Sequence, residues 1–279
     1  MTRRIQEVLT EGIAALRSAG VPDPARDARL LMADALGLPA DRLTLHLHDP
    51  WPGSGMHQWF EHVAARSARQ PVSQILGRRA FYGRMFCVTS DVLDPRPETE
   101  ILVETALDAP AKRILDIGTG SGCILLTLLA EWSEASGIGT DCSQAALDVA
   151  RTNAQTLGLE DRASWQSTHW ATDVAGTFDL VVSNPPYIDQ AELDHLEPEV
   201  TRWEPPMALS PGLDGTSSYQ DLVPQAERVL TPRGRLILEI GPTQADAVSE
   251  ILRSASFTDI QAHTDLDGRN RVIAARKPL

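Results

Sequence analysis

Four residues that follow a buried stretch of the chain are of the types that can hold a planar –NH2 group. Residues 178–183 are apolar enough to form a buried strand, and Asn184-Pro185-Pro186-Tyr187 comes directly after them. The prolines stiffen this turn, so the Pro185 carbonyl can face a ligand beside the Asn184 amide oxygen. Tyr187 offers a flat face against which a planar group can pack. We assign substrate binding to Asn184, Pro185, Pro186 and Tyr187.

Two neighbouring acceptors suit methyl transfer to the nitrogen of an amide or an aryl amine. Such a nitrogen is a poor nucleophile because its lone pair is delocalised, and holding both of its hydrogens favours the pyramidal nitrogen of the transition state. Alignment with an electrophilic methyl carbon at ~3–3.5 Å supplies much of the rest, and the proton can leave after attack. We assign catalysis to Asn184, Pro185 and Tyr187. The alternative is an ordinary rigid turn, because Asn-Pro pairs also mark turns.

A glycine-rich loop and a later acid could bind the methyl donor. The loop follows an apolar strand and consists of Gly118, Thr119, Gly120, Ser121 and Gly122. Its GxGxG spacing differs from the GxGxxG of dinucleotide folds and favours an adenosine ligand without a pyrophosphate, such as S-adenosylmethionine. About 20 residues further on, Asp141 ends the next expected strand, where its carboxylate can accept both ribose hydroxyls. The alternative is that the glycines only tighten a turn and Asp141 caps the helix that begins at Ser143.

The elements that must position these residues alternate between strands and helices from residue 111 onwards. Expected strands are 113–117, 137–141, 163–167, 178–183, 235–240, 259–263 and 271–275. Helical stretches between them include 123–132, 143–157 and 243–254. This alternation predicts an α/β fold with a mostly parallel sheet covered by helices on both faces, and ligands bind beyond the carboxyl ends of the strands of such a sheet.

The front of the chain has a different pattern. Residues 3–70 show apolar positions at helical spacing, which predicts a small bundle that serves either stability or substrate docking. Residues 73–76 and 81–88 resemble short strands and predict a β-hairpin linker. We therefore expect a helical N-terminal domain at 1–70, the linker at 71–96 and a second domain at 97–279.

Composition limits the partners and the compartment. The formal net charge is −13, and residues 1–84 carry 11 basic and 8 acidic side chains, whereas residues 85–279 carry 14 and 30. An acidic body repels phosphate backbones, so we expect no stable binding of nucleic acid. The three cysteines form no CxxC pair and the histidines show no HExxH spacing, so we expect reduced thiols and no metal site. No apolar run is long enough to span a membrane, and no secretory signal is present, so we expect a cytoplasmic protein.

Together these residues resemble class I S-adenosylmethionine-dependent methyltransferases that act on planar –NH2 nitrogens. The closer resemblance is to the bacterial protein-(glutamine-N5) methyltransferases of peptide-chain release factors, and it covers nearly the whole chain. The string Arg-Pro-Glu-Thr-Glu at residues 96–100 discriminates best, because DNA adenine methyltransferases share the Asn-Pro-Pro-Tyr turn without it. The resemblance implies a seven-stranded Rossmann-like methyltransferase domain behind a small helical N-terminal domain and a β-hairpin linker.

The resemblance also implies the reaction and the roles of residues. The substrate would be the glutamine of the Gly-Gly-Gln motif in release factors, and the donor S-adenosyl-L-methionine would leave as S-adenosyl-L-homocysteine. Asn184, Pro185 and Tyr187 match the glutamine-binding turn. His169 stands where the family usually has Asp before Trp170. The positions that match cofactor contacts are Gly118–Gly122, Asp141, Trp170 and Asn184.

Other readings share parts of this pattern. A sister enzyme that methylates a glutamine of a ribosomal protein has the same chemistry and differs mainly in its front domain. A DNA adenine-N6 methyltransferase is disfavoured by the acidic balance, and a catalytically silent scaffold has no need of the Asn184–Tyr187 turn. The acidic stretch at 189–204 is expected to form either a solvated face or a flap over the substrate.

Overall fold

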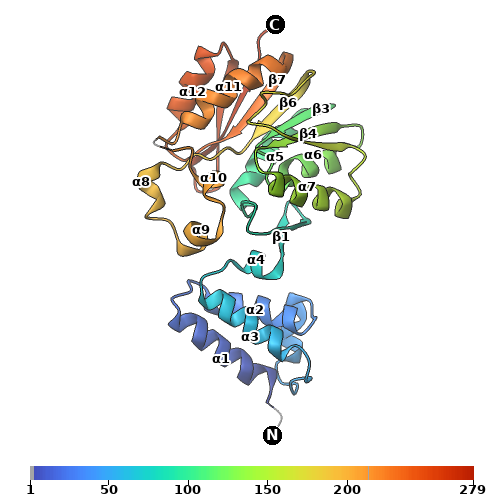
Figure 1. Cartoon of the computed structure of the whole chain (residues 1–279), viewed down its shortest axis with the longest axis vertical. Helices are drawn as coiled ribbons and strands as arrows, with labels where there is room; N and C mark the ends of the chain where they lie inside the picture. Colours follow the sequence, from blue (N-terminus) through green and yellow to red (C-terminus); the bar gives the residue numbers. More distant parts are fainter. Residues whose placement is uncertain (1–2, 213) are drawn as a thin grey trace. The chain divides into compact units, whose positions relative to one another are not determined.

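The computed structural model describes residues 3–212 and 214–279, which fall into two compact units. The N-terminal unit comprises the chain up to Gly77 together with Glu197–Trp203, and the sheet unit comprises Arg78–Leu196 and Glu204–Leu279. Each unit has an apolar core of its own (Figure 1). The chain therefore leaves the sheet unit for one short segment and returns to it.

Helices build the N-terminal unit, as the apolar spacing predicts. They are α1 (Ile5–Ser18), α2 (Pro24–Ala35), the 3-10 helix η1 (Ala40–His46), α3 (Met56–Ser67), α4 (Val72–Leu76) and α9 (Pro198–Trp203). Helix α2 begins at a capped position, because the Asp23 side chain accepts from the Arg26 amide and Pro24 occupies the first turn. Trp59 is fully buried, and its ring lies 2.3 Å from where a Cβ on Gly12 would be. Only glycine therefore lets α1 and α3 approach this closely.

The strand expected at residues 73–76 is wrong, because these residues belong to helix α4. A run of four residues with two apolar positions fits a strand or a short helix equally well by pattern. Gly77 adopts φ 67° and ends α4 with a left-handed cap. The hairpin itself is present but begins later, with β1 (Arg78–Phe81) and β2 (Arg84–Cys87) joined by Tyr82 and Gly83.

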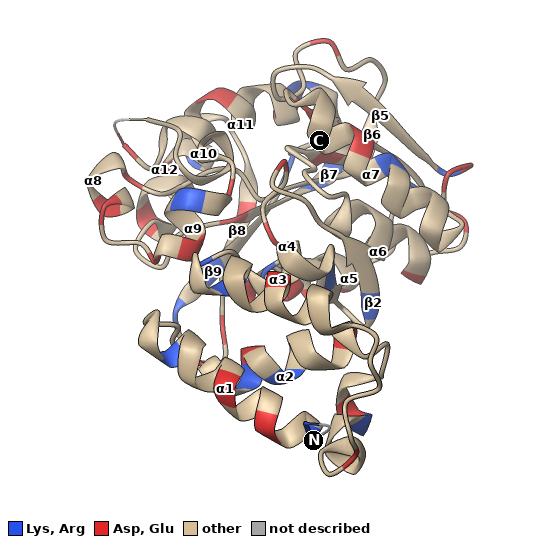
Figure 2. Ribbon diagram, turned by 60° about the horizontal axis from the view of Figure 1, so that its bottom comes forward, with Lys and Arg blue, Asp and Glu red and all other residues tan. Residues whose placement is uncertain are grey.

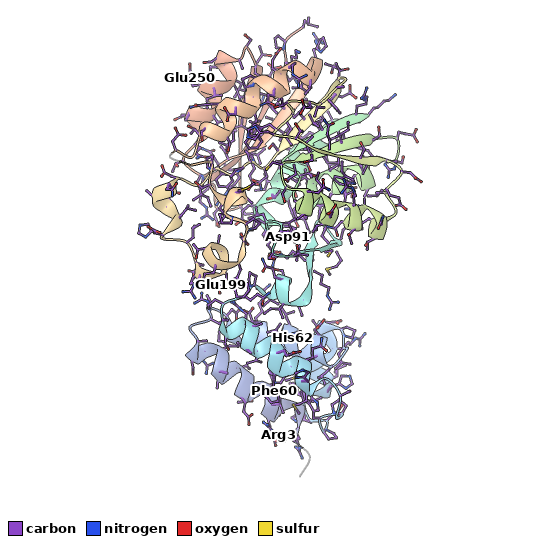
Figure 3. The ribbon with its side chains drawn as sticks, in the orientation of Figure 1. Arg3, Phe60, His62, Asp91, Glu199 and Glu250 are labelled. Carbon is purple, nitrogen blue, oxygen red and sulfur yellow. The ribbon has the colours of Figure 1, made fainter. Side chains whose placement is uncertain are left out.

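Helix α9 joins the N-terminal unit through ion pairs of Glu199. The Glu199 carboxylate accepts from Arg66 Nη2 at 2.8 Å and from Arg69 Nη2 at 2.6 Å. Gln74 Nε2 also donates to the carbonyl of Trp203 at 2.9 Å. Glu199, labelled in Figure 3, is thus held by the buried Arg66 and the partly buried Arg69, although it lies in a stretch for which one expectation was a solvated face.

A seven-stranded sheet forms the second unit, with the strand order β5-β4-β3-β6-β7-β9-β8. Strands β3 to β7 run parallel (Figure 1). Strand β9 lies antiparallel between β7 and β8. The expected strands are all present, although β7 begins five residues earlier than the pattern indicates. Their bounds are β3 (Arg113–Ile117), β4 (Ser136–Asp141), β5 (Ala163–Ser167), β6 (Phe178–Ser183), β7 (Leu230–Glu239), β8 (Thr258–Thr264) and β9 (Asn270–Arg276).

Helices cover both faces of this sheet, because successive residues of its central strands point to opposite sides. Ile114 and Leu180 pack in one core cluster, whereas Leu115 and Val181 pack in the other. The first cluster includes α5 (Glu100–Leu107) and α6 (Cys123–Glu131), and the second includes α11 (Ser217–Val229) and α12 (Ala245–Ser254). The remaining helical segments of the unit are the 3-10 helix η2 (Pro97–Thr99), α7 (Gln144–Leu157), α8 (Gln190–Leu193) and α10 (Pro206–Leu209). The α/β class and the seven-stranded sheet are confirmed.

Candidate active site

A cavity of about 530 Å³ lies at the carboxyl ends of β3, β4 and β6. It brings together most of the residues assigned from sequence: Gly118, Thr119, Gly120, Ser121, Asp141, Trp170, Asn184 and Pro186. Every residue that lines it belongs to the sheet unit. Of the assigned residues, Gly122, Pro185 and Tyr187 are not among those that line it.

The glycine loop has a backbone that leaves room for a ligand. Gly120 has φ 52°, and a Cβ built on it would meet nothing within 4 Å. Thr119 Oγ1 donates to Asp116 Oδ2 at 2.7 Å, which fixes the loop to the end of β3. Gly122 has another role, because it begins α6 with φ 78° and packs close to Trp165. The loop is thus an anchored and open surface that an adenosine ligand can approach.

Asp141 links the loop to the next helix. Its Oδ2 accepts from the Gly120 amide at 3.0 Å, and its Oδ1 accepts from the Ser143 amide at 2.9 Å. Ser143 caps α7, since its hydroxyl accepts from the Ala146 amide. The capping alternative for Asp141 therefore gives way to a carboxylate aimed at the loop. Burial raises the pKa of Asp141, and the backbone amides of Ser143 and Gly120 oppose this shift.

Trp170 adds a flat apolar face to the cavity. Its ring lies 3.9 Å from where a Cβ on Gly118 would be, and the His169 ring stands at its edge, with 5.2 Å between the centroids. The Trp170 backbone has φ 55°, which is strained for a bulky residue and is found at ligand sites. The Trp170 Nε1 is buried without a hydrogen-bond partner among the described residues. These features fit a planar nucleoside base.

The Asn184–Tyr187 turn is tied down from several sides. Asn184 Nδ2 donates to Thr99 Oγ1 at 3.2 Å, and the Pro186 carbonyl accepts from Ser218 Oγ at 2.8 Å. The Tyr187 hydroxyl donates to Glu239 Oε1 at 3.2 Å. Burial raises the pKa of Tyr187 well above its ordinary value, and the charge of Glu239 adds to the shift. The turn is rigid, and Asn184 and Pro186 present it to the cavity.

Three residues of the site were given no role of their own by sequence reasoning, although Thr99 lies in the string at 96–100. Thr99 lines the cavity beside Asn184, and Glu239 is fully buried behind the turn. Glu204 accepts from Arg96 Nη2 with both carboxylate oxygens, at 2.5 and 2.7 Å. Burial raises the pKa of both Glu204 and Glu239 to about 7. An acid at the end of an otherwise apolar strand was the one available signal for Glu239.

Two kinds of feature are absent from residues 3–212 and 214–279. No group of His, Cys, Asp and Glu side chains in these ranges is arranged to hold a metal ion. No helix in them combines the length and the apolar character that crossing a bilayer requires.

Comparisons with known proteins agree on the kind of enzyme. Two family models match the chain, the PrmC N-terminal domain over residues 7–77 and the Methyltransferase small domain over residues 85–198. A methyltransferase from Pyrococcus furiosus has a similar fold, with a TM-score of 0.55 and 16% identity, over 72% of this chain and 92% of that chain.

Full-length relatives extend the match. The release factor glutamine methyltransferase of Cereibacter sphaeroides is 48% identical over 275 residues, which cover 99% of each chain. The enzyme of the same name from Rhodospirillum rubrum is 44% identical over 97% of this chain and 84% of its own. The chain is therefore a methyltransferase that belongs to the release factor glutamine methyltransferase family.

Proposed function

We propose that this enzyme transfers a methyl group from S-adenosyl-L-methionine to the side-chain amide nitrogen of a glutamine, the one in the Gly-Gly-Gln motif of peptide-chain release factors. One observation carries the proposal. The Asn184 turn and the glycine loop with Asp141 open into the same cavity, at the ends of adjacent strands. An amide acceptor and an adenosine donor can therefore meet there. The names of the full-length relatives support the choice of substrate.

The residues of the cavity fit S-adenosylmethionine. Asp141 offers carboxylate oxygens for ribose hydroxyls, the loop at Gly118 and Gly120 offers open backbone, and Trp170 offers a face for the base. When bound, this cofactor supplies a methyl carbon that is electrophilic because it is attached to a sulfonium. Its product would be S-adenosyl-L-homocysteine.

The turn orients the acceptor amide. Asn184 Nδ2 is occupied by Thr99, so the Asn184 oxygen remains to accept from the substrate –NH2, with the Pro185 carbonyl as the second proposed acceptor. Holding both hydrogens favours the pyramidal nitrogen of the transition state over the planar amide. Tyr187 acts from behind the turn in this arrangement, because its hydroxyl is engaged by Glu239.

Charge supports a protein acceptor over duplex DNA. Figure 2 shows acidic residues along α8 and α12 of the sheet unit, and the whole chain has a net charge of −13. Asp91, Asp94, Asp141 and Asp221 line the cavity, whereas Arg96 is its one lysine or arginine among the described residues and is paired with Glu204. Such a surface repels a phosphate backbone. The N-terminal unit, in which 9 basic and 10 acidic side chains nearly balance, is proposed to help dock the release factor.

Labelled cofactor tests the proposal directly. The enzyme is incubated with S-adenosylmethionine carrying a labelled methyl group and, separately, with a release factor, a release factor whose Gly-Gly-Gln glutamine is replaced by alanine, ribosomal proteins, or duplex DNA. We expect label only in the unmodified release factor, at the motif glutamine. Label in DNA or in ribosomal proteins, or equal label in the alanine-substituted release factor, would overturn the assignment.

The Asn184→Ala variant tests the site. We expect its rate to fall by about 10²–10³, while its circular dichroism and cofactor affinity show that the fold persists. Asp148→Asn, an exposed change on α7, is the matched control and should retain the rate. Normal turnover by Asn184→Ala would contradict the role given to the turn.

A further inference from the structure

We propose that Glu239 is a positioning residue that determines, through the Thr99 hydroxyl, which side of the Asn184 amide faces the cavity. The inference deepens the proposed function, since it concerns the group that would hold the acceptor amide. It rests on a series of polar contacts that runs from a buried carboxyl group to the cavity wall.

This series of contacts begins at the end of the central strand β7. Glu239 is 1% exposed and lies beside the end of β6, because Ser183 pairs with Leu238 in the sheet. Its Oε1 accepts from the Tyr187 hydroxyl at 3.2 Å, and the Thr99 side chain, which accepts from Asn184 in the same turn, lowers the pKa of the carboxyl group as a neighbouring donor does. The second oxygen, Oε2, has no partner in the hydrogen-bond geometry of the described residues. Glu239 therefore has spare accepting capacity in a place without water-exposed surface.

Thr99 transmits the polarity of this carboxylate. Its hydroxyl has a single proton, and it is 2% exposed. An ionised Glu239 can only accept, so the Thr99 proton points to Glu239 and a lone pair of Thr99 Oγ1 remains for Asn184. Asn184 Nδ2 donates to that oxygen at 3.2 Å.

The direction in which these groups donate decides whether the Asn184 side chain offers an acceptor or donors to the cavity. With Asn184 Nδ2 turned toward Thr99, the Asn184 Oδ1 is left for the cavity that Asn184 lines. An oxygen there accepts from a substrate –NH2, whereas a reversed amide would present two donors to it. A neutral group at position 239 can donate to Thr99, which frees the Thr99 proton for Asn184 Oδ1 and removes the preference. The charge of Glu239 thus selects the orientation that an amide acceptor needs.

Protonation near neutrality makes this selection sensitive to pH. Burial raises the pKa of Glu239 to about 7, although hydrogen bonds from Thr99 and Tyr187 favour the ionised form. The correct orientation is therefore preferred above this pH and is lost below it. The titratable and charged groups that face Glu239 are Tyr187 in the turn, Tyr219 on α11, Glu98 in η2, Arg271 on β9 and Cys123 on α6.

Rates of variants test the chain of contacts. Glu239→Gln should lower kcat for the acceptor about tenfold at pH 8.5, the size of a modest loss of orientation, with unchanged affinity for the cofactor. The ratio of wild-type to variant rate should fall toward one as the pH drops below about 7, since titrations that both proteins share cancel in the ratio. A purely structural role predicts a ratio that does not depend on pH.

A double-mutant cycle identifies the route. In a Thr99→Val background, Glu239→Gln should have no further effect on kcat, whereas Thr99→Ser should restore both the rate and the sensitivity to position 239. Ser183→Ala, which removes a buried hydrogen bond to Ile117 at the same edge, is the control for loss of stability. An undiminished effect of Glu239→Gln in the Thr99→Val background, or an equal loss of rate in Ser183→Ala, would overturn the proposal.

An NMR readout separates this proposal from the proposed function. The sequence contains three asparagines, Asn153, Asn184 and Asn270, so selective ¹⁵N-asparagine labelling gives three side-chain amide pairs. The Asn184 pair should shift with a midpoint near pH 7 in the wild type and should not shift in Glu239→Gln, with Asn153 as internal reference. This titration without methyl transfer would refute the proposed substrate and leave the positioning role intact, whereas an unchanged titration in Glu239→Gln would refute the positioning role.

Discussion

Arg69 and Glu199, which are 130 residues apart in the chain, form a two-point ion pair. Arg69 Nε donates to Oε1 at 2.8 Å, and Nη2 donates to Oε2 at 2.6 Å. Such fork-to-fork geometry is the strong form of an arginine–carboxylate contact. Glu199 lies between two stretches that supply the cavity, since Asn184 and Pro186 precede α9 and Met207 and Ser210 follow it. The ion pair therefore fixes the middle of a segment whose two ends form the cavity wall.

Removal of this carboxylate should release α9 from the N-terminal unit. Glu199→Ala leaves Arg69 without its strongest partner and weakens the contacts of Arg66, at a cost of about 1–3 kcal/mol. Hydrogen exchange over residues 197–203 should rise, and limited proteolysis there should accelerate. Glu192→Ala, on the exposed side of α8, is the control and should change neither. Protection of α9 that survives in Glu199→Ala would show that apolar packing alone holds it.

The Glu199 contribution also has a defined pH window. Burial opposes ionisation of Glu199, but hydrogen bonds from Arg69 and Arg66 outweigh it and lower the pKa. An acid whose pKa is lower in the folded state stabilises the fold above its unfolded pKa and loses this contribution as the pH falls through the folded value. The exchange of α9 should therefore increase in acid, below about pH 4.

The sheet could be predicted from sequence, whereas α9 and its ion pair could not. Apolar strands such as Phe178–Ser183 and Arg113–Ile117 are marked by burial on both faces, which constrains the residue types strongly. Glu199 and Arg69 are polar residues in polar stretches, and no local pattern joins positions so far apart. The strand expected at residues 73–76 failed for a related reason, because its apolar residues are too few to distinguish a strand from helix α4.

The residues of the site also differ in how far the sequence predicts them. Gly118 and Asn184 stand directly after expected strands and Asp141 ends one, so the rule that ligands bind at the carboxyl ends of parallel strands brings them to one cavity. Thr99, which lines the cavity, and Glu239, which is buried behind the turn, come from elements whose placement depends on tertiary packing. The prolines and Tyr187 were expected to face the substrate directly. The structure places Pro186 in the cavity wall and the Tyr187 hydroxyl against Glu239.

Asp141 should matter for cofactor binding more than for folding. Asp141→Asn keeps the size of the side chain but removes the negative charge that is proposed to hold two ribose hydroxyls, and we expect the dissociation constant of S-adenosylmethionine to rise about 10- to 100-fold. Calorimetry measures the constant, and Asp148→Asn on α7 is the control with the same change at an exposed position. Equal affinities of the two variants for S-adenosylmethionine would contradict the proposed contact between Asp141 and the ribose.

Two glycines separate the cost of backbone strain from the cost of packing. A Cβ on Gly122 would lie 3.0 Å from the Trp165 ring and 3.2 Å from Ala150, whereas a Cβ on Gly158 would meet nothing within 4 Å. Both residues have positive φ, 78° and 66°. Gly158→Ala should cost about 1 kcal/mol of unfolding free energy for strain alone, and Gly122→Ala should cost about 1–3 kcal/mol more. Denaturant titrations compare them, and equal costs would show that Trp165 moves aside freely.

Ionised Glu239 should lower the stability of the fold in the same pH range in which it is proposed to support catalysis. Its pKa is raised by burial to about 7 in the fold, above the ordinary value of 4.5. A group with a raised pKa binds more protons in the folded state, so its stabilising contribution is complete below the unfolded pKa and disappears as the pH rises through the folded one. Between pH 5 and pH 8.5 this change amounts to about 1–3 kcal/mol. Asp116 and Glu204, whose pKa values burial also raises to about 7, act in the same direction.

Glu239→Gln isolates the share of this one residue. The amide carries no charge to bury, so the variant should be more stable than the wild type at pH 8.5, and this advantage should vanish at pH 5, where the wild-type carboxyl group is protonated. Chemical denaturation at both pH values measures the difference. Ser183→Ala removes no titrating group, so it should change the free energy of unfolding equally at both pH values. A variant that is destabilised at pH 8.5 would mean that Thr99 and Tyr187 stabilise the ionised carboxylate by more than its burial costs. In that case the ionised Glu239 stabilises the fold, and no role in catalysis is needed to explain its presence behind Asn184. If Glu239 instead selects the orientation of the Asn184 amide, Glu239→Gln must be both more stable and slower than the wild type.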